Sequence, residues 1–396
     1  MCSVLIPQVN LLRSVYSDYS VVHICNILTE VLIKSLQIKL TGGPDGDVAG
    51  NEIKILVREY GDNAKIVGLA DASGCAEDPD GLNHEELLRL VAQGKSISEF
   101  NTEKLGPNGV LHTCETTEGT KARNSMHNRV VADAFVPCGG RPNTIDILNY
   151  KNFLRADGSP SSKLIVEGAN IFITAEARKA LHDEAGVMII KDSSANKGGV
   201  ITSSYEICAA MLLSEDEFFR NKNAIVKEVL EKLRHLAKLE ANLLLREYDT
   251  FGGTLPETSQ IISNCINRTT DALAEALDTL SDDAKTELLP LFRAHLPKTL
   301  ADLSFDQVHV RVPEAYIKNA IASCLASKLV YKEGTKFIDS LPRKDLANIA
   351  LKYVKKESEV AKLIEELQST EMCEEEKEKI VKLLEAGGAR TALGAF

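Results

Sequence analysis

The sequence predicts an α/β fold in which a doubly wound, Rossmann-like parallel sheet is followed by an all-helical C-terminal region. From about residue 36 to residue 205, short apolar runs alternate with helical stretches, which is the pattern of parallel strands connected by helices. The runs are apolar nearly throughout, as expected of strands that are buried on both faces. After residue 205, long stretches with helical spacing replace them. We therefore divide the chain into residues 1–35, 36–205 and 206–396.

Five segments of the middle region have the apolar, β-rich character of buried strands. They are residues 36–41, 64–70, 131–138, 163–169 and 186–192. Polar turns that contain glycine follow the last three of them. In a doubly wound sheet such turns lie at the carboxyl ends of the strands, where ligands bind.

The region after residue 205 shows three helical patterns. Ser214 and Glu217 form a capping-box signal at the start of a long amphipathic helix. A second helix is predicted between Pro313, which suits a first helical turn, and Gly334, which suits the stop; Ile317, Ile321, Cys324 and Leu325 share one face of it. Residues 356–388 predict a charged helical hairpin.

Composition excludes several classes of protein. The 396 residues are 44% hydrophobic and 26% charged, which is ordinary for a globular chain and argues against disorder or a fibrous protein. The net charge of −11 disfavours nucleic-acid binding, because an acidic surface repels phosphate backbones. No apolar run approaches the ~20 residues of a spanning helix, so we expect no membrane partner.

The nine cysteines are scattered and show no spacing of a zinc site, so we expect no bound metal. Cysteines in this pattern indicate reduced thiols and an intracellular protein. Residues 1–35 fit a secretory signal poorly, because the first basic residue, Arg13, follows the apolar stretch. A transit peptide stays open, and we favour a mitochondrial over a cytoplasmic location.

The most informative stretch is the glycine-rich turn after the first strand. Gly42, Gly43, Gly46 and Gly50 lead into an amphipathic helix, and a second strand ends at Asp71. Glycines let the backbone approach a pyrophosphate, and the helix N-terminus offers free N–H groups to it. An acid about 20 residues beyond the turn accepts hydrogen bonds from an adenosine ribose and repels a 2′-phosphate. The stretch therefore predicts a dinucleotide site that prefers NAD over NADP.

Two features of this turn leave another interpretation open. The spacing from Gly43 is GxxGxxxG rather than GxGxxG, so a glycine-rich turn without a nucleotide, with Asp71 as a surface residue, remains an alternative. Asp45 and Asp47 would also repel a pyrophosphate. Asp47 can instead cap the helix, and Asp45 would then face solvent.

Taken together, the turns resemble the glutamate dehydrogenase family, and in detail its large NAD-specific class. The matching segments are KLTGGPDGDVAGN, IVGLADASGCAEDPDGL, FVPCGGRP, VEGANIFIT and ANKGGVITSSYE, followed by HLPKTLADL and IASCLASKLVYKEG. They occur in collinear order over about residues 36 to 345. The resemblance implies oxidative deamination of L-glutamate to 2-oxoglutarate and ammonia with NAD as cofactor. It makes residues 36–205 the NAD-binding domain and implies a homo-oligomer.

The resemblance also implies site residues. Those for the cofactor are Gly43, Gly46, Asp47, Val48 and Gly50 at the diphosphate, Asp71 at the adenosine ribose, Cys138 and Gly139 beside the cofactor cleft, Asn170 at the nicotinamide ribose, and Asn196 near the nicotinamide. Those for the substrate are Val200 and Ser203, with the adjacent Ser204 as an alternative to Ser203. Serines rather than apolar residues at this position favour an acidic substrate over an apolar amino acid.

The sequence departs from the family at its N-terminus. The family's catalytic lysine and aspartate lie in a separate domain upstream of the dinucleotide domain. Here Lys34 is the only lysine within residues 1–35, and this segment contains none of the family's upstream motifs. We therefore expect no catalytic residue in this chain, which resembles the C-terminal part of a larger enzyme. Its first 35 residues are either divergent or a mispredicted start. The alternative function is an inactive NAD-binding regulatory or interaction module.

Overall fold

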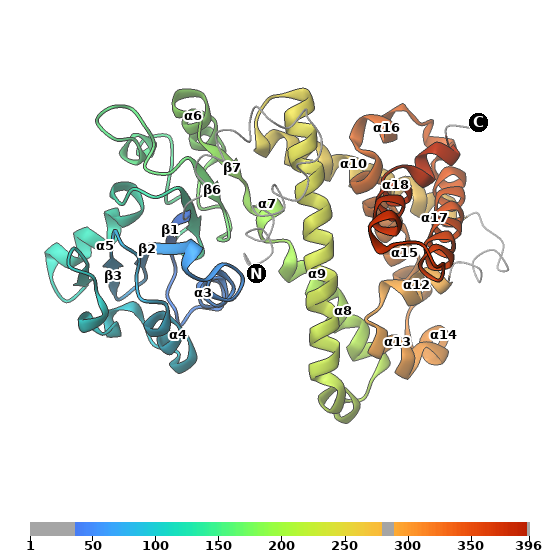
Figure 1. Ribbon diagram of the computed structural model, residues 1–396, viewed down its shortest axis with the longest axis horizontal. Helices are drawn as coiled ribbons and strands as arrows, with labels where there is room; N and C mark the ends of the chain where they lie inside the picture. The colour runs from blue at the N-terminus through green and yellow to red at the C-terminus, as the bar shows by residue number, and fades with distance from the viewer. Residues whose placement is uncertain (1–35, 279–288, 394–396) are drawn as a thin grey trace. The chain divides into compact units, whose positions relative to one another are not determined.

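The structure is a computed structural model that describes residues 36–278 and 289–393 (Figure 1). The N-terminal segment 1–35 therefore lies outside the described residues. The chain divides into two compact units, one of Met1–Ser204 with Val229–Gln260 and one of Tyr205–Glu228 with Ile261–Phe396. Residues 229–260, which we expected in the helical region, thus group with the α/β unit.

The α/β unit is built on a seven-stranded sheet of order β4-β3-β2-β1-β5-β6-β7. Its parallel strands are β1 (Leu36–Thr41), β2 (Ala64–Ala70), β5 (Ala134–Pro137), β6 (Leu164–Val166) and β7 (Met188–Ile190). All five predicted strands are confirmed, the last three in shorter form. Two further strands, β3 (Gly74–Glu77) and β4 (Val110–Thr113), pair antiparallel at the edge beyond β2. Neither strand was predicted from the sequence.

Helices and short 3-10 turns connect these strands, and one short helix, α7, follows the last strand. The helices are α3 (Asp47–Tyr60), α4 (His84–Gln93), α5 (Thr117–Arg129), α6 (Ala175–Ala185) and α7 (Asp192–Ala195), and the turns are η2 (Gly61–Asn63), η3 (Ile97–Glu99), η4 (Thr102–Lys104) and η5 (Tyr150–Phe153). Local caps explain where several of them begin and end. The Thr174 side chain accepts from Ala177 N before α6, and Gly186 ends that helix with a φ of 64°.

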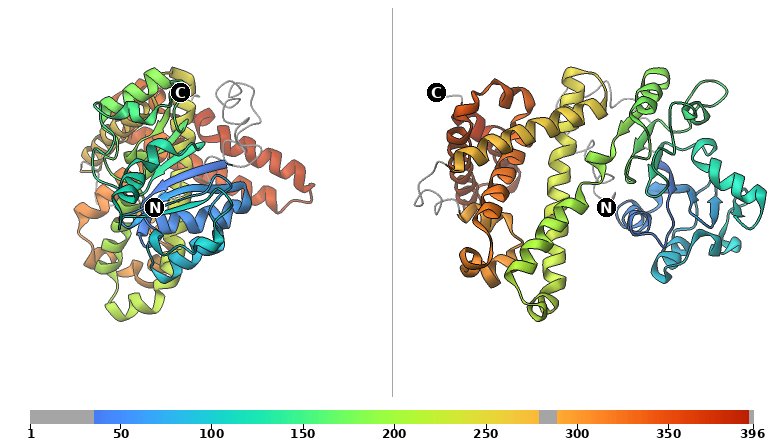
Figure 2. Two further views of the ribbon diagram at one scale, coloured as in Figure 1. Left: turned by 90° about the vertical axis from the view of Figure 1, so that its left-hand side faces the viewer. Right: turned by 180° about the vertical axis from the view of Figure 1, so that it is seen from behind.

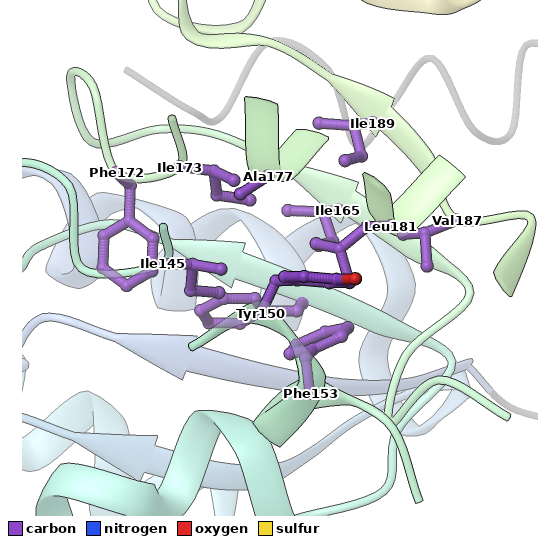
Figure 3. Close-up of a cluster of buried hydrophobic side chains, with 11 residues drawn as sticks. Ile145, Tyr150, Phe153, Ile165, Phe172, Ile173, Ala177, Leu181, Val187 and Ile189 are labelled. Atoms are coloured by element: carbon purple, nitrogen blue, oxygen red, sulfur yellow. The ribbon is translucent and has the colours of Figure 1, made fainter. Parts of the chain in front are cut away.

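Both faces of the central strands are covered. Successive side chains of a strand point to opposite faces, yet Ile38, Lys39 and Leu40 of β1 are all fully buried. On the side of β6 and β7, the core is a cluster of aliphatic and aromatic side chains from the strands, η5 and α6 (Figure 3). Phe153, Phe172 and Leu181 are at most 1% exposed in it. Burial of such side chains is the main favourable contribution to folding.

The remaining chain is helical (Figures 1 and 2). Its elements are α8 (Gly198–Leu212), α9 (Glu215–Phe251), α10 (Leu255–Asp278), α12 (Leu289–His295), α13 (Lys298–Ser304), η6 (Phe305–Gln307), α14 (Val308–Arg311), α15 (Glu314–Glu333), α16 (Thr335–Ser340), η7 (Arg343–Asp345), α17 (Leu346–Gln368) and α18 (Glu374–Leu393). The predicted capping box of α9 is confirmed, because Ser214 N and Ser214 Oγ both donate to Glu217 Oε2 at 2.8 and 2.6 Å.

The predicted second helix is α15, with two small differences. Pro313 is the residue just before the helix rather than part of its first turn. Of the predicted face, Ile317, Ile321 and Leu325 are buried whereas Cys324 is only half-buried. The predicted charged hairpin is confirmed as α17 and α18. No helix among the described residues has the length and apolarity needed to cross a membrane.

Candidate functional site

The connections of the sheet reverse direction at β1. The chain runs from β1 through α3 to β2 on one side and later returns to β5 on the other side of β1. In an open α/β sheet the ligand crevice lies outside the carboxyl ends of the strands at such a switch point. Here those ends are Thr41 and Pro137, which are paired in register. The Gly42–Gly46 turn and the Cys138–Gly139 turn, both predicted from sequence, therefore start side by side.

The two turns are in direct backbone contact. Cys138 N donates to Thr41 O at 2.7 Å, and Thr41 Oγ1 donates to Gly139 O at 2.6 Å. Gly42 has a φ of +103°, and a Cβ there would lie 2.9 Å from Gly139 N. A side chain at either position would force the turns apart, so glycine is required for this close approach.

The turn leads directly into the N-terminus of α3. Gly46 N donates to Gly43 O at 2.9 Å, and Gly46 is the N-cap residue, without a side-chain cap. The expectation that Asp47 caps the helix is wrong, because Asp47 is the first helical residue and is exposed. The first helical hydrogen bond runs from Gly50 N to Gly46 O. The N–H groups of Asp47, Val48 and Ala49 therefore have no acceptor within the helix. They form a cradle suited to an anion.

The glycines of the cradle have different roles. A Cβ at Gly50 would lie 2.6 Å from Pro44 O, so Gly50 allows α3 to pack against the turn. A Cβ at Gly46 would approach only Gly43 O, at 3.2 Å, and the backbone at Gly46 has an ordinary φ of −85°. The backbone at Gly46 is therefore less restrictive toward a side chain than the backbone at Gly42 or Gly50, although the contact with Gly43 O is closer than usual for a Cβ.

Asp71 follows β2 and borders the same turn. A Cβ at Gly43 would lie 2.6 Å from Asp71 Oδ2. Asp71 Oδ1 accepts from Ser73 N and Ser73 Oγ at 2.7 and 2.6 Å, whereas Oδ2 accepts from Ile97 N at 2.7 Å. The carboxylate is thus held in one orientation beside the cradle, and Oδ2 keeps capacity for a further donor. The contact with η3, which supplies Ile97, was not predictable from the sequence, because Ile97 lies 26 residues after Asp71.

The turns after β6 and β7 bring the two predicted asparagines together. Asn196 Nδ2 donates to Asn170 Oδ1 and, at 3.3 Å, to Gly168 O. Ala169 N donates to Pro137 O at 2.6 Å, which ties the turn after β6 to the end of β5. Asn170 and Asn196 therefore lie at the same edge of the sheet as the glycine turn.

The turn that carries Asn170 is strained and held from two sides. Ile171 has a φ of +54°, a left-handed conformation that is rare for a β-branched residue. Its N–H donates to Asp192 Oδ2 at 2.8 Å, and its carbonyl accepts from Asn143 N at 2.7 Å. Strain of this kind costs on the order of 1–3 kcal/mol and persists where the surroundings determine the conformation, commonly at functional sites.

A buried ion pair between Glu167, which precedes this turn, and Arg178 of α6 holds the turn in place. Arg178 Nε donates to Glu167 Oε2 at 2.8 Å, and Glu167 Oε1 accepts from Ile173 N at 3.1 Å. Arg178 also lies 3.8 Å from Asp192. Burial raises the pKa of Glu167, and the hydrogen bonds from Arg178 oppose that rise. Glu167, Arg178 and Asp192 were not among the predicted residues; the VEGAN motif contained Glu167, but its partner lies on α6.

Comparison with known proteins identifies the family. The family model described as Glutamate/Leucine/Phenylalanine/Valine dehydrogenase matches residues 11–248, which is more than half of the chain. The chain belongs to this family. The match begins within residues 1–35, where the sequence analysis found no motif of the family.

Several curated relatives are similar over 74% of this chain. "Glutamate dehydrogenase 2" of Dictyostelium discoideum is 35% identical over 319 residues. "Probable NAD-specific glutamate dehydrogenase" of Schizosaccharomyces pombe and "NAD-specific glutamate dehydrogenase" of Saccharomyces cerevisiae are 36% and 35% identical. The matches cover 30%, 28% and 29% of these relatives, so this dehydrogenase-family chain spans less than a third of their length.

The predicted substrate residues of this family member lie at the start of α8. Val200 is 80% exposed and Ser203 is exposed. The hydroxyl of the neighbouring Ser204 donates to Ile201 O at 2.7 Å within its own helix. Ser203 is therefore the more exposed of the two serines, and its role at the substrate stays a prediction.

Two lysines near the sheet, Lys39 and Lys197, have amines that are bound to other protein groups. Lys39 is fully buried, its Nζ donates to Val130 O and Ser161 Oγ at 2.7 Å each, and burial lowers its pKa to about 6. Lys197 pairs with Glu240 at 2.6 Å. Lys191, which follows β7, is half-buried. Within residues 36–278 and 289–393, no group of His, Cys, Asp and Glu side chains is arranged to hold a metal ion.

Proposed function

We propose that this chain binds NAD at the β1–β5 switch point and supplies the cofactor-binding part of an NAD-dependent oxidative deamination of L-glutamate to 2-oxoglutarate and ammonia. The observation that carries the proposal is the cradle formed by the Gly42–Gly46 turn, the N-terminus of α3 and the Cys138–Gly139 turn. The names of the relatives support NAD and glutamate as ligands. NAD, when bound, takes up the hydride that leaves the substrate's α-carbon.

The residues of the chain fit NAD in three ways. The glycine at position 46 and the N–H groups in the first turn of α3, which have no acceptor within the helix, suit a diphosphate. The oriented carboxylate of Asp71 suits two ribose hydroxyls. Asn170 and Asn196 present amide groups at the same edge of the sheet, where a nicotinamide ribose would lie.

The preference for NAD over NADP rests on Asp71. Its carboxylate would repel a 2′-phosphate, and residues 71–78 contain no Arg or Lys to receive one. Isothermal titration calorimetry of this chain with both cofactors tests the preference. We expect NAD to bind more tightly, and equal or tighter binding of NADP would contradict it. The wild-type chain is the better probe, because replacing Asp71 also breaks the bonds to Ser73 and Ile97.

A specific observation favours a second candidate, an NAD-binding module without catalytic activity of its own. Of Lys39, Lys191 and Lys197, the first and the last have their amines occupied by other protein groups and are thus not free for proton transfer. Both candidates bind NAD, and they differ in turnover. We expect the chain to form negligible NADH from L-glutamate. Turnover of roughly 1–10³ per second, the ordinary enzymatic range, would exclude the inactive module and make Lys191 the first residue to replace.

A further inference from the structure

The C-terminal helices α17 and α18 form a hairpin that is anchored only at its base. Tyr353 of α17 is 1% exposed, and Lys332 of α15 lies over its ring at 5.8 Å. From Val354 to Leu384, by contrast, every side chain is half-buried or exposed. The left view of Figure 2 shows the two helices running out together from the other helices of their unit. Beyond its base, the hairpin therefore packs mainly on itself.

The hairpin has an apolar seam that stays only half-buried between its two helices. Ile364 and Leu367 on α17, and Ile380 and Leu384 on α18, follow the three-and-four spacing of packed helices and are all half-buried. An apolar stripe of this kind is stable when another element covers it. Next to the seam, Leu363 is 50% exposed and Leu383 is 73% exposed. The surface is thus apolar along its centre and open to a partner.

The charges on the hairpin are divided along its length. Its outer half, residues 363–378, contains seven glutamates and one lysine. Its inner half, residues 352–362 and 379–384, contains six lysines and two glutamates. Both glutamates are paired, Glu357 with Lys328 and Lys332 of α15, and Glu359 with Lys356 of the hairpin itself. A negative outer half therefore adjoins a positive inner half.

We propose that this hairpin is a homotypic interface, on which the hairpin of a second copy of the chain packs antiparallel to form a four-helix bundle. Across a two-fold axis, the same patch of both copies is in contact, and the two patches run in opposite directions. The acidic outer half of one hairpin then lies against the basic inner half of the other, twice. A parallel arrangement would place the two acidic halves together, which opposes association. The seam supplies the apolar contact, and the charges determine the orientation.

Sedimentation analysis of the full chain tests the interface by charge reversal. We expect a dimer that weakens as salt rises, because the complementary charges are screened. The double variant Glu375→Lys/Glu376→Lys and the double variant Lys355→Glu/Lys356→Glu should each be monomeric. The variant that combines all four substitutions restores opposite charges across the two-fold axis and should dimerise again.

Two further variants separate the interface from general effects. Glu215→Lys/Asp216→Lys places the same charge change in the first turn of α9, outside the hairpin, and should leave the dimer intact. Leu363→Glu/Leu383→Glu replaces exposed side chains beside the seam, and should give a folded monomer with unchanged helical circular dichroism. A wild-type chain that stays monomeric, an oligomer that the hairpin variants retain, or a combined variant that fails to reassociate would each overturn the proposal.

Discussion

Lys39 provides a quantitative test of the core of the α/β unit. Its amine is fully buried between β1 and the rings of Phe135 and Phe153, 5.6 and 4.6 Å away, and burial lowers its pKa from 10.5 to about 6. Between those two pH values the unfolded chain binds a proton at this lysine and the folded chain does not. The free energy of unfolding therefore rises with pH in this window, by about 1.4 kcal/mol per pH unit.

The variant Lys39→Met removes this dependence. It also leaves Val130 O and Ser161 Oγ without their donor, but that loss is the same at every pH. From pH 7 to pH 9 the wild type should gain about 2.7 kcal/mol of stability relative to the variant. The nearby His127 does not interfere, because burial lowers its pKa to about 4 and it titrates below this range.

The assay is urea unfolding followed by far-ultraviolet circular dichroism at both pH values. Lys54→Met, a change at an exposed lysine on α3, is the matched control and should track the wild type. If the difference between wild type and Lys39→Met is the same at pH 7 and pH 9, then Lys39 keeps its proton in the folded state and the reasoning fails.

Three other substitutions test the site. Gly46→Ala should change the stability of the NAD-free protein by no more than about 1 kcal/mol. It should nevertheless abolish the protection that NAD gives against thermal unfolding, which is about 2.7 kcal/mol at a hundredfold excess over Kd. Gly50→Ala should instead lower the stability of the NAD-free protein, because the new Cβ would meet Pro44 O. Full protection of Gly46→Ala would show that the diphosphate lies elsewhere. Ile171→Asn should stabilise the free protein by about 1 kcal/mol, because asparagine tolerates the left-handed conformation and Ile171 is half exposed; a lower melting temperature would contradict the strain at this residue.

Local patterns were sufficient for the parallel strands and for the glycine turn. Residues 36–41 and 64–70 were predicted with their observed bounds, since a short β-rich run between turn residues is a signal that the sequence carries locally. The strands β3 and β4 were not predictable in this way. Each has four residues and no apolar run, and they become strands by pairing antiparallel with a neighbour that is already in the sheet.

The sequence by itself determined that glycines, an acid and two asparagines follow the strands of one α/β unit. Only the tertiary structure decided that Asn170 meets Asn196, that Asp71 is oriented by Ile97, and that Lys39 is buried. The physical reason is that hydrogen bonds across many residues, and the desolvation of a charge, depend on what packs around a group. A local pattern specifies which groups the chain offers, whereas their partners and their protonation follow from the contacts made when distant segments fold together.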